Sequence, residues 1–288
     1  MTTAKTRKAA VADRGTAGAE RHYQRFDRYH RVTHILLMTS FLGLAFSGLP
    51  LRFSDQAWAA TLARFLGGFE AAGLIHRFCA ILMIGLFVAH IARIVHRVYV
   101  LKDFSALWGP ASMVPQPRDL SEMVAHFRYF VGLAPRPRFD HFTYWEKFDY
   151  WAVFWGMFII GGSGLMLWFP TFFAWFVPGW VFNIAMLIHG EEALLAVGFI
   201  FTIHFFNGHL RPEKFPMDLV AFTGKIPEHE FKDERPAEWE RLAVEGRLGD
   251  FESGPPSDGS VVVGRVLGTI AVTLGLLMVA LIVFALIA

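Results

Sequence analysis

The chain has a single cysteine among its 288 residues, and this scarcity excludes several kinds of site. One thiol cannot form an internal disulfide, a cysteine zinc site or an iron–sulfur cluster. The pattern Cys-x-x-Cys-His is missing as well, which excludes a covalently attached c-type haem. Cys79 lies in an apolar stretch, where a free thiol behaves as a small buried apolar group.

Charged residues are also few. They make up 18% of the chain, against about a quarter in a typical soluble domain, whereas 54% of the residues are hydrophobic and 16% are aromatic. The formal net charge of +2 is small and no basic stripe with interleaved aromatic residues is present, so we expect no nucleic-acid partner. Residues 1–31 are polar, Arg-rich and without an apolar core, which argues against a secretory signal peptide.

Long hydrophobic runs, by contrast, are abundant. A membrane-spanning helix needs about 20 mostly apolar residues, and the segments that satisfy this are 32–51, 74–101, 148–169, 181–206 and 266–288. The fold class predicted is an all-α membrane protein, in which a four-helix transmembrane bundle is followed by a fifth, C-terminal transmembrane helix. The predicted domains are an N-terminal basic arm (1–31), the bundle (32–210) with a Pro-rich loop (102–147), a charged segment (211–260) and the last helix (261–288). No internal repeat is obvious.

Lysine and arginine predict the orientation of these spans, because they concentrate on the cytoplasmic side of a membrane. The arm and the links 102–147 and 211–260 are rich in both, whereas the first link has only Arg52 and Arg64 and the link 170–180 has neither. We therefore expect the N-terminus in the cytoplasm and the C-terminus outside. Within the last cytoplasmic link, residues 228–247 are expected to form either a surface helix or a flexible connection.

Histidines stand in pairs inside two of the predicted spans. His76 and His90 lie fourteen residues apart on the second span, and His189 and His204 lie fifteen apart on the fourth. At 100° per residue each pair falls broadly on one face of its helix, with about 21–22 Å between its members along the axis. The two helices are predicted to be parallel, so His76 and His189 share the outer depth, and His90 and His204 the inner one.

Matched depths are what a haem needs when it is held between two helices. Haem iron takes axial ligands from the two sides of its ring, so two facing pairs predict two haems, one near each membrane surface, which together form an electron path. His34 lies one turn into the first span at the depth of the inner pair, and it is a further candidate ligand there.

The stretch Arg31-Val-Thr-His34, followed by the small-residue-rich run Ser40 to Gly48, resembles the first helix of the di-haem cytochrome b subunits of respiratory formate dehydrogenases and nickel–iron hydrogenases. His76-Arg77 and the pair on the fourth span match as well, and the resemblance covers roughly residues 25–215. The resemblance implies a bacterial inner-membrane protein with two b haems. The outer haem would be held by His76 and His189, the inner one by His34 and His204.

Two features depart from that family: the presence of His90 and the fifteen-residue spacing on the fourth span. Both look more like the cytochrome b of bc-type complexes, where the second and fourth helices supply all four ligands. The inner partner of His204 therefore stays open between His34 and His90. A third haem, built from the remaining histidine with His209 or His96, is not expected.

Other residues are candidates for supporting parts. Arg77 is placed to pair with a haem propionate at the outer surface, or to act as an interfacial anchor. Glycines 161, 162 and 164, with Ser163, give room either for a flat ring or for close helix packing. The resemblance implies quinone chemistry near the inner haem, with menaquinone or ubiquinone as substrate. Proton donors are needed there, and the candidates are His209, Glu213 and Asp218, whose alternative role is to cap a helix end.

The sequence thus predicts a transmembrane electron-transfer subunit that links the quinone pool to an extracytoplasmic partner: a cytochrome c, an iron–sulfur subunit or a molybdoenzyme. No flavin, nicotinamide or molybdenum fingerprint is present, so the chain is expected to be a subunit rather than a complete enzyme. Two alternatives are a histidine-lined transporter of protons or metal ions and a non-redox membrane anchor for a soluble enzyme.

Overall fold

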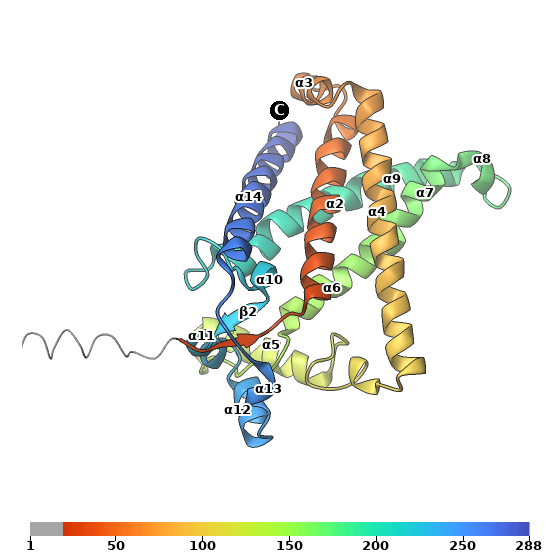
Figure 1. The fold of residues 1–288 in the computed structure, drawn as a ribbon. Coiled ribbons are helices and arrows are strands. Elements are labelled where there is room, and N and C mark those ends of the chain that lie inside the picture. Colours follow the sequence, from red (N-terminus) through yellow and green to blue (C-terminus); the bar gives the residue numbers. More distant parts are fainter. Residues whose placement is uncertain (1–19, 288) are drawn as a thin grey trace, which may run out of the picture.

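Five long apolar helices form the frame of the molecule, which is described by a computed structural model over residues 20–287 (Figure 1). Each is long and apolar enough to cross a membrane, in agreement with the predicted all-α, multi-pass fold. The five spans are α2 (Arg28–Arg52); α4 (Phe69–Val95) with the π-helical turn η1 (His96–Val100); α6 (Tyr144–Gly156), η3 (Met157–Gly161) and α7 (Gly162–Trp168); α9 (Trp180–Phe199), η4 (Ile200–His204) and η5 (Phe206–Leu210); and α14 (Asp258–Ile287).

The spans begin earlier than hydropathy predicted because their first turns are polar. The Asp27 side chain accepts a hydrogen bond from the His30 backbone N–H at 2.8 Å and so caps α2. Thr143 and Glu146 form a capping box at the start of α6. Such caps satisfy the free N–H groups of a helix end, and they extend the helices into sequence that a hydrophobic window does not detect.

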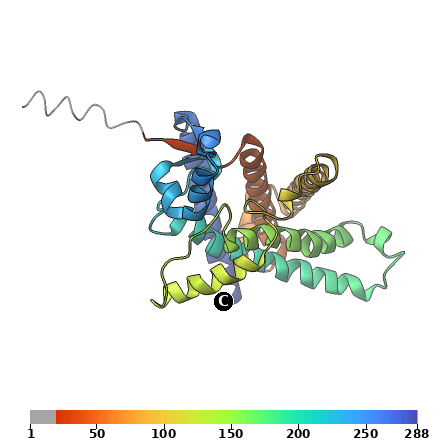
Figure 2. The ribbon, with the colours of Figure 1, turned by 90° about the horizontal axis from the view of Figure 1, so that it is seen from below.

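The spans pack as two hairpins and a fifth helix. α2 packs along α4, and α7 packs along α9, but the second hairpin is steeply inclined to the first (Figures 1 and 2). The predicted simple four-helix bundle is therefore not confirmed. α4 runs from the end that carries α3 (Ala57–Phe65) to the opposite end, and α9 runs from α8 (Pro170–Phe173), which projects from one side, back across the molecule.

The apolar core lies where the two hairpins meet α14. Leu49 of α2, Phe53 directly after α2, Phe201 in η4, and Met278 of α14 are buried together there. A Cβ on Gly275 would lie 2.4 Å from the Phe201 ring, so α14 approaches the fourth span closely because it presents a glycine at the contact.

A cap, here defined as residues 20–27, 102–143 and 211–257, covers the end opposite α3 and α8. Strand β1 (His22–Gln24) pairs antiparallel with β2 (Lys225–Pro227) on one side and β3 (Glu252–Ser253) on the other. Its helices are η2 (Phe104–Ala106), α5 (Pro117–Phe130), α10 (Val220–Thr223), α11 (Glu228–Glu234), α12 (Pro236–Val244) and α13 (Leu248–Phe251). The charged segment 228–247 is thus folded into helices. Of the predicted basic arm, residues 1–19 lie outside the described part.

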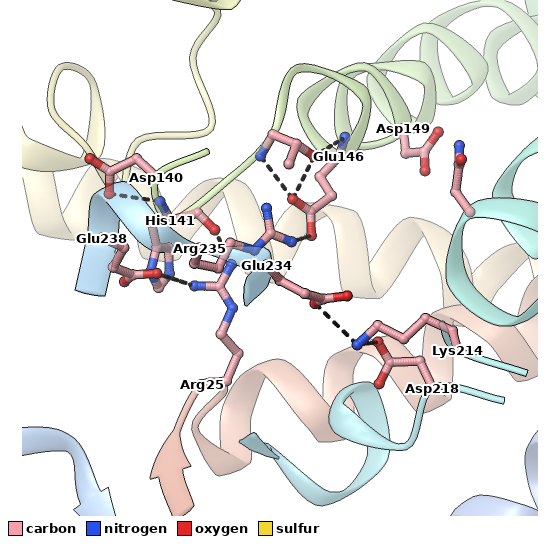
Figure 3. A network of polar contacts seen from close by, with 12 residues as sticks. Arg25, Asp140, His141, Glu146, Asp149, Lys214, Asp218, Glu234, Arg235 and Glu238 are labelled. Atoms are coloured by element: carbon pink, nitrogen blue, oxygen red, sulfur yellow. Dashed lines mark hydrogen bonds and ion pairs between the residues drawn. The ribbon is translucent and has the colours of Figure 1, made fainter. Parts of the chain in front are cut away.

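Buried ion pairs hold the cap together (Figure 3). Arg25, which follows β1, pairs with Glu238 of α12 at 3.0 Å. Arg235 pairs with Glu146 of α6 at 2.8 Å and so ties the cap to the third span. Lys214 is surrounded by three carboxylates: Glu230, Asp218 at 3.0 Å and Glu234 at 3.1 Å.

Candidate functional site

The two histidines predicted for the outer site face each other. The ring centres of His76 on α4 and His189 on α9 are 6.1 Å apart, and the ring planes are inclined by 74°. An imidazole nitrogen bonds a metal ion at about 2.0–2.1 Å, so two imidazoles on opposite sides of one ion have their ring centres about 6 Å apart. The separation is therefore suitable for a shared metal.

Hydrogen bonds set the same tautomer on both rings. The Nδ1 atom of His76 lies 3.2 Å from the Leu44 carbonyl oxygen, and the Nδ1 atom of His189 lies 2.9 Å from that of Ile160. A carbonyl oxygen only accepts, so both protons are on Nδ1 and both lone pairs are on Nε2. No hydrogen bond to either Nε2 is found among the described residues, and a metal-binding histidine commonly has this arrangement.

A serine supports each of these rings from the neighbouring helix. The Ser47 hydroxyl donates to the Gly43 carbonyl at 2.6 Å and lies 3.3 Å from His76 Nδ1. The Ser163 hydroxyl donates to the Ile159 carbonyl at 2.6 Å and lies 3.4 Å from His189 Nδ1. Each hydroxyl oxygen is thus a second acceptor beside the Nδ1–H group, and it restricts rotation of the ring.

A glycine follows each serine and lies against the same imidazole. A Cβ built on Gly48 would lie 3.2 Å from His76 Cε1, and one built on Gly164 would lie 2.9 Å from His189 Cε1. A Cβ on Gly162 would meet nothing within 4 Å. Gly164 therefore makes room for a histidine of the neighbouring helix. The sequence analysis had assigned this glycine either to close helix packing or to providing room for a flat ring.

These supports belong to a short internal repeat that the sequence analysis missed. Residues 47–53 (Ser-Gly-Leu-Pro-Leu-Arg-Phe) and 163–169 (Ser-Gly-Leu-Met-Leu-Trp-Phe) are identical at five of seven positions. Each copy ends the first helix of a hairpin, and each contacts the histidine of the second helix. The repeat was the available sequence signal for Ser47 and Ser163, but seven residues are too few to stand out in an apolar chain.

At the inner depth, His204 has a carboxylate partner. Its Nδ1 atom lies 2.9 Å from Asp149 Oδ2. The contact engages Nδ1, and no hydrogen bond to His204 Nε2 is found among the described residues. A carboxylate inside a span is costly unless it is paired. Asp149 was not identified from the sequence, although its position within the third span was a signal.

His90 is arranged differently. Its Nε2 atom, rather than Nδ1, is engaged, by the Tyr150 hydroxyl at 2.8 Å. Its ring centre is 6.4 Å from that of Phe154, so His90 packs against the third span. Its role as the partner of His204 stays a prediction.

His34 lies nearer to the inner group. It is within electrostatic range of both His204 and His209. Its Nδ1 atom is buried and has no hydrogen-bond partner in the described part of the chain, and its ring centre is 6.3 Å from that of Phe222 in α10. An unpaired buried polar atom is costly, so His34 is the inner histidine that most needs a further partner.

The outer basic candidate has an aromatic neighbour. The Arg77 guanidinium lies 5.7 Å from the centre of the Trp168 ring, a cation–π contact at the end of the second repeat. The exposed Arg52 at the same end pairs with Glu191 at 2.7 Å. Arg77 thus remains near the outer histidines, in a position that fits either of its two predicted roles.

Two of the three quinone candidates are brought together. The His209 Nδ1 atom accepts a hydrogen bond from the Asp218 backbone N–H at 3.3 Å. The Asp218 carboxylate accepts from the backbone N–H of Val220, the first residue of α10, at 2.7 Å, and it pairs with Lys214. Glu213 is exposed, and no hydrogen bond or ion pair to it is found among the described residues. Lys214, buried beside them, was missed by the sequence analysis.

No group of three or more histidine, cysteine or acidic side chains able to hold a metal ion is found within residues 20–287. A haem iron takes up to two ligands from the protein, so a haem site would need only two imidazoles.

Neither a scan against protein-family models nor a search of curated proteins finds a match to the chain.

Proposed function

We propose that this chain is a di-haem cytochrome b: the electron-transfer subunit of a respiratory oxidoreductase in the bacterial inner membrane, linking the quinone pool to an extracytoplasmic redox partner. The observation that carries the proposal is the outer pair. His76 and His189 come from different hairpins, face each other at 6.1 Å between ring centres and have both Nδ1 atoms engaged by carbonyls. A structural histidine pair would not need both Nε2 atoms to be left available.

The residues present fit the proposed group. His76 and His189 would hold the outer haem through Nε2, and His204, oriented by Asp149, would hold the inner one with His34 as the favoured partner. Bound haem supplies reversible one-electron chemistry. The chain's own part would be to hold each ligating imidazole in place by engaging its Nδ1 atom, through the Leu44 and Ile160 carbonyls and the Asp149 carboxylate.

The quinone end of the proposed path lies beside the inner histidines. Quinone chemistry moves protons together with electrons, so its site needs groups that exchange protons with water. His209 and Asp218 are in contact at the cap end of the fourth span. The cap contains the basic links, which the positive-inside rule assigns to the cytoplasm. The redox partner would then dock at the end that carries α3 and α8.

Haem content tests the proposal directly. The full chain, expressed with an adequate haem supply, is expected to purify with two b haems and to show low-spin b-haem bands when reduced. His76→Ala and His189→Ala should each remove one haem, whereas the matched control His126→Ala, in the cap against Trp145, should remove none. A colourless wild-type protein would exclude the proposal and favour the transporter or the anchor.

Two further variants decide the inner ligand. We expect His34→Ala to lose the inner haem, because His34 interacts with His204 and has a buried nitrogen without a partner. His90→Ala should keep both haems, since the Nε2 atom of His90 is engaged by Tyr150. The reverse result would assign the inner site to the ligand set of bc-type complexes.

A further inference from the structure

Helix α5 in the cap exposes an apolar stripe that no described residue covers. Leu120, Val124, Phe127 and Val131 recur at intervals of four, three and four residues, so they fall along one side of the helix. Their side chains are between 50% and 68% exposed. Isolated exposed apolar residues are ordinary, but a contiguous row indicates an interaction surface.

A buried ion pair fixes the rotation of α5. The Lys147 ammonium at the start of α6 contacts both Asp119 carboxylate oxygens at 2.8 Å, and the two side chains are only 2% and 9% exposed. Breaking a buried pair of this kind is strongly unfavourable. The pair therefore holds the stripe facing away from the protein.

The segment before α5 contacts the first turns of α6, where the third span begins. Trp151, two turns into α6, donates through its indole N–H to the Met113 carbonyl, just before α5, at 3.0 Å. In Figure 2, where α2 and α4 are viewed nearly along their axes, α5 lies across the view. It thus lies across the direction of the first hairpin, as the second hairpin does too, and Figure 1 shows it near the start of α6.

Neighbouring segments continue the apolar surface. Phe104, Leu107 and Trp108 around η2 are exposed, directly after the second span ends. Phe148, on the first turns of α6, is exposed as well and belongs to a membrane-spanning helix. Aromatic residues are enriched where a membrane protein meets the headgroup layer. Segments before and after α5 in the chain thus also expose apolar side chains, and one of these belongs to a membrane-spanning helix.

We infer that α5 is an interfacial helix, whose stripe inserts into the lipid layer on the cap side of the membrane. An amphipathic helix of this kind lies in the membrane plane with its apolar face about 5–10 Å into the headgroup and acyl boundary. The exposed Arg128 lies one residue after Phe127, in a position to meet lipid phosphates. The inference depends on the membrane-spanning fold and not on the proposed haems.

Spin labels test the occupant of the stripe. Single cysteines replace Leu120, Val124 or Phe127 in the full chain in lipid nanodiscs, and collision rates are measured with oxygen and with a water-soluble nickel chelate. Val88→Cys, exposed on the membrane-spanning helix α4, gives the lipid reference. Asp250→Cys on α13 gives the water reference. The unmodified chain shows whether the buried Cys79 takes up label.

The expected result is that the three stripe labels behave like Val88→Cys, with high oxygen accessibility and little access for nickel. Labels accessible to nickel, as in Asp250→Cys, would overturn the inference by placing the stripe in water. Labels shielded from both reagents would also overturn it, because a protein partner or a second copy would then be the occupant. Thermal melting of each variant confirms that the cysteine has not unfolded the chain.

Discussion

At the residue scale, the small residues around His76 and His189 determine how the two imidazole rings are positioned. Gly48 and Gly164 let an imidazole approach the neighbouring helix, and Ser47 and Ser163 lie beside the Nδ1 atoms. The same Ser-Gly pair is used twice, once per hairpin, so the two rings are held by equivalent surroundings. Under the proposed function, a small change in these surroundings should weaken the outer haem and leave the inner one unaffected.

Gly164→Ala is expected to weaken the outer haem. The added methyl group would lie 2.9 Å from His189 Cε1, and overpacking of this kind costs about 1–3 kcal/mol. A cost in this range corresponds to roughly a fivefold to hundredfold loss of haem affinity. Gly162→Ala, two residues away and with open space around it, is the matched control. Equal haem content in the two variants, measured by pyridine haemochrome, would show that His189 tolerates displacement.

Asp149→Ala is expected to disturb only the inner haem. Loss of the carboxylate removes the acceptor for His204 Nδ1, and the removal of such a second partner lowers metal affinity by about 10–100-fold. Where haem remains, loss of the negative charge should raise its reduction potential. The control is the adjacent Tyr150→Phe, which affects only His90. Redox titration of both variants checks this, and a shifted outer potential in Asp149→Ala would contradict it.

At the element scale, the helices carry local π turns where the site is built. Ile160, the acceptor for His189, lies in η3, and His204 lies in η4. Such turns rotate the residues beyond them relative to a regular helix, and they occur often at functional sites. The angle between His189 and His204 around the fourth span therefore differs from the value calculated at 100° per residue, because that value holds only for a regular α-helix.

The attachment of α5 to α6 is open to a double-mutant test. Asp119→Ala leaves the Lys147 ammonium buried without a partner, and we expect a loss of about 3–5 kcal/mol in stability. Replacing both residues, as Asp119→Leu with Lys147→Met, should recover most of that loss because no charge is then buried. Thermal unfolding in detergent gives the comparison. A double variant no more stable than Asp119→Ala would show that the charges are needed for another reason.

At the scale of the whole molecule, the cap joins three segments that are far apart in the sequence. Arg25, His141 and Glu238 meet there from β1, the long loop and α12. Burial, followed by the charge of Arg25, lowers the pKa of His141 below its usual value of 6.5. Burial alone would raise the pKa of Glu238, but hydrogen bonding to His141 and the charge of Arg25 outweigh it and hold the pKa below 4.5.

Both lowered pKa values make the cap less stable in acid. In each case the unfolded chain binds more protons than the folded one, so the free energy of unfolding falls as the pH falls. The loss begins below about pH 6.5 through His141 and continues below about pH 4.5 through Glu238. Limited proteolysis of the cap should therefore be faster at pH 5.5 than at pH 7.5. His141→Gln should reduce this difference; an unchanged difference would assign it to other groups.

The sequence by itself determined the membrane-spanning fold, because twenty apolar residues have few other stable environments than a bilayer. It also singled out His76, His189, His204, His90 and His34 as candidate ligands, since histidine is rare within apolar helices. Only the tertiary structure decided which atoms meet. The inclined packing of the two hairpins, the Nδ1 partners Leu44, Ile160 and Asp149 and the assembly of the cap depend on contacts between distant segments, which local hydropathy and helical periodicity do not contain.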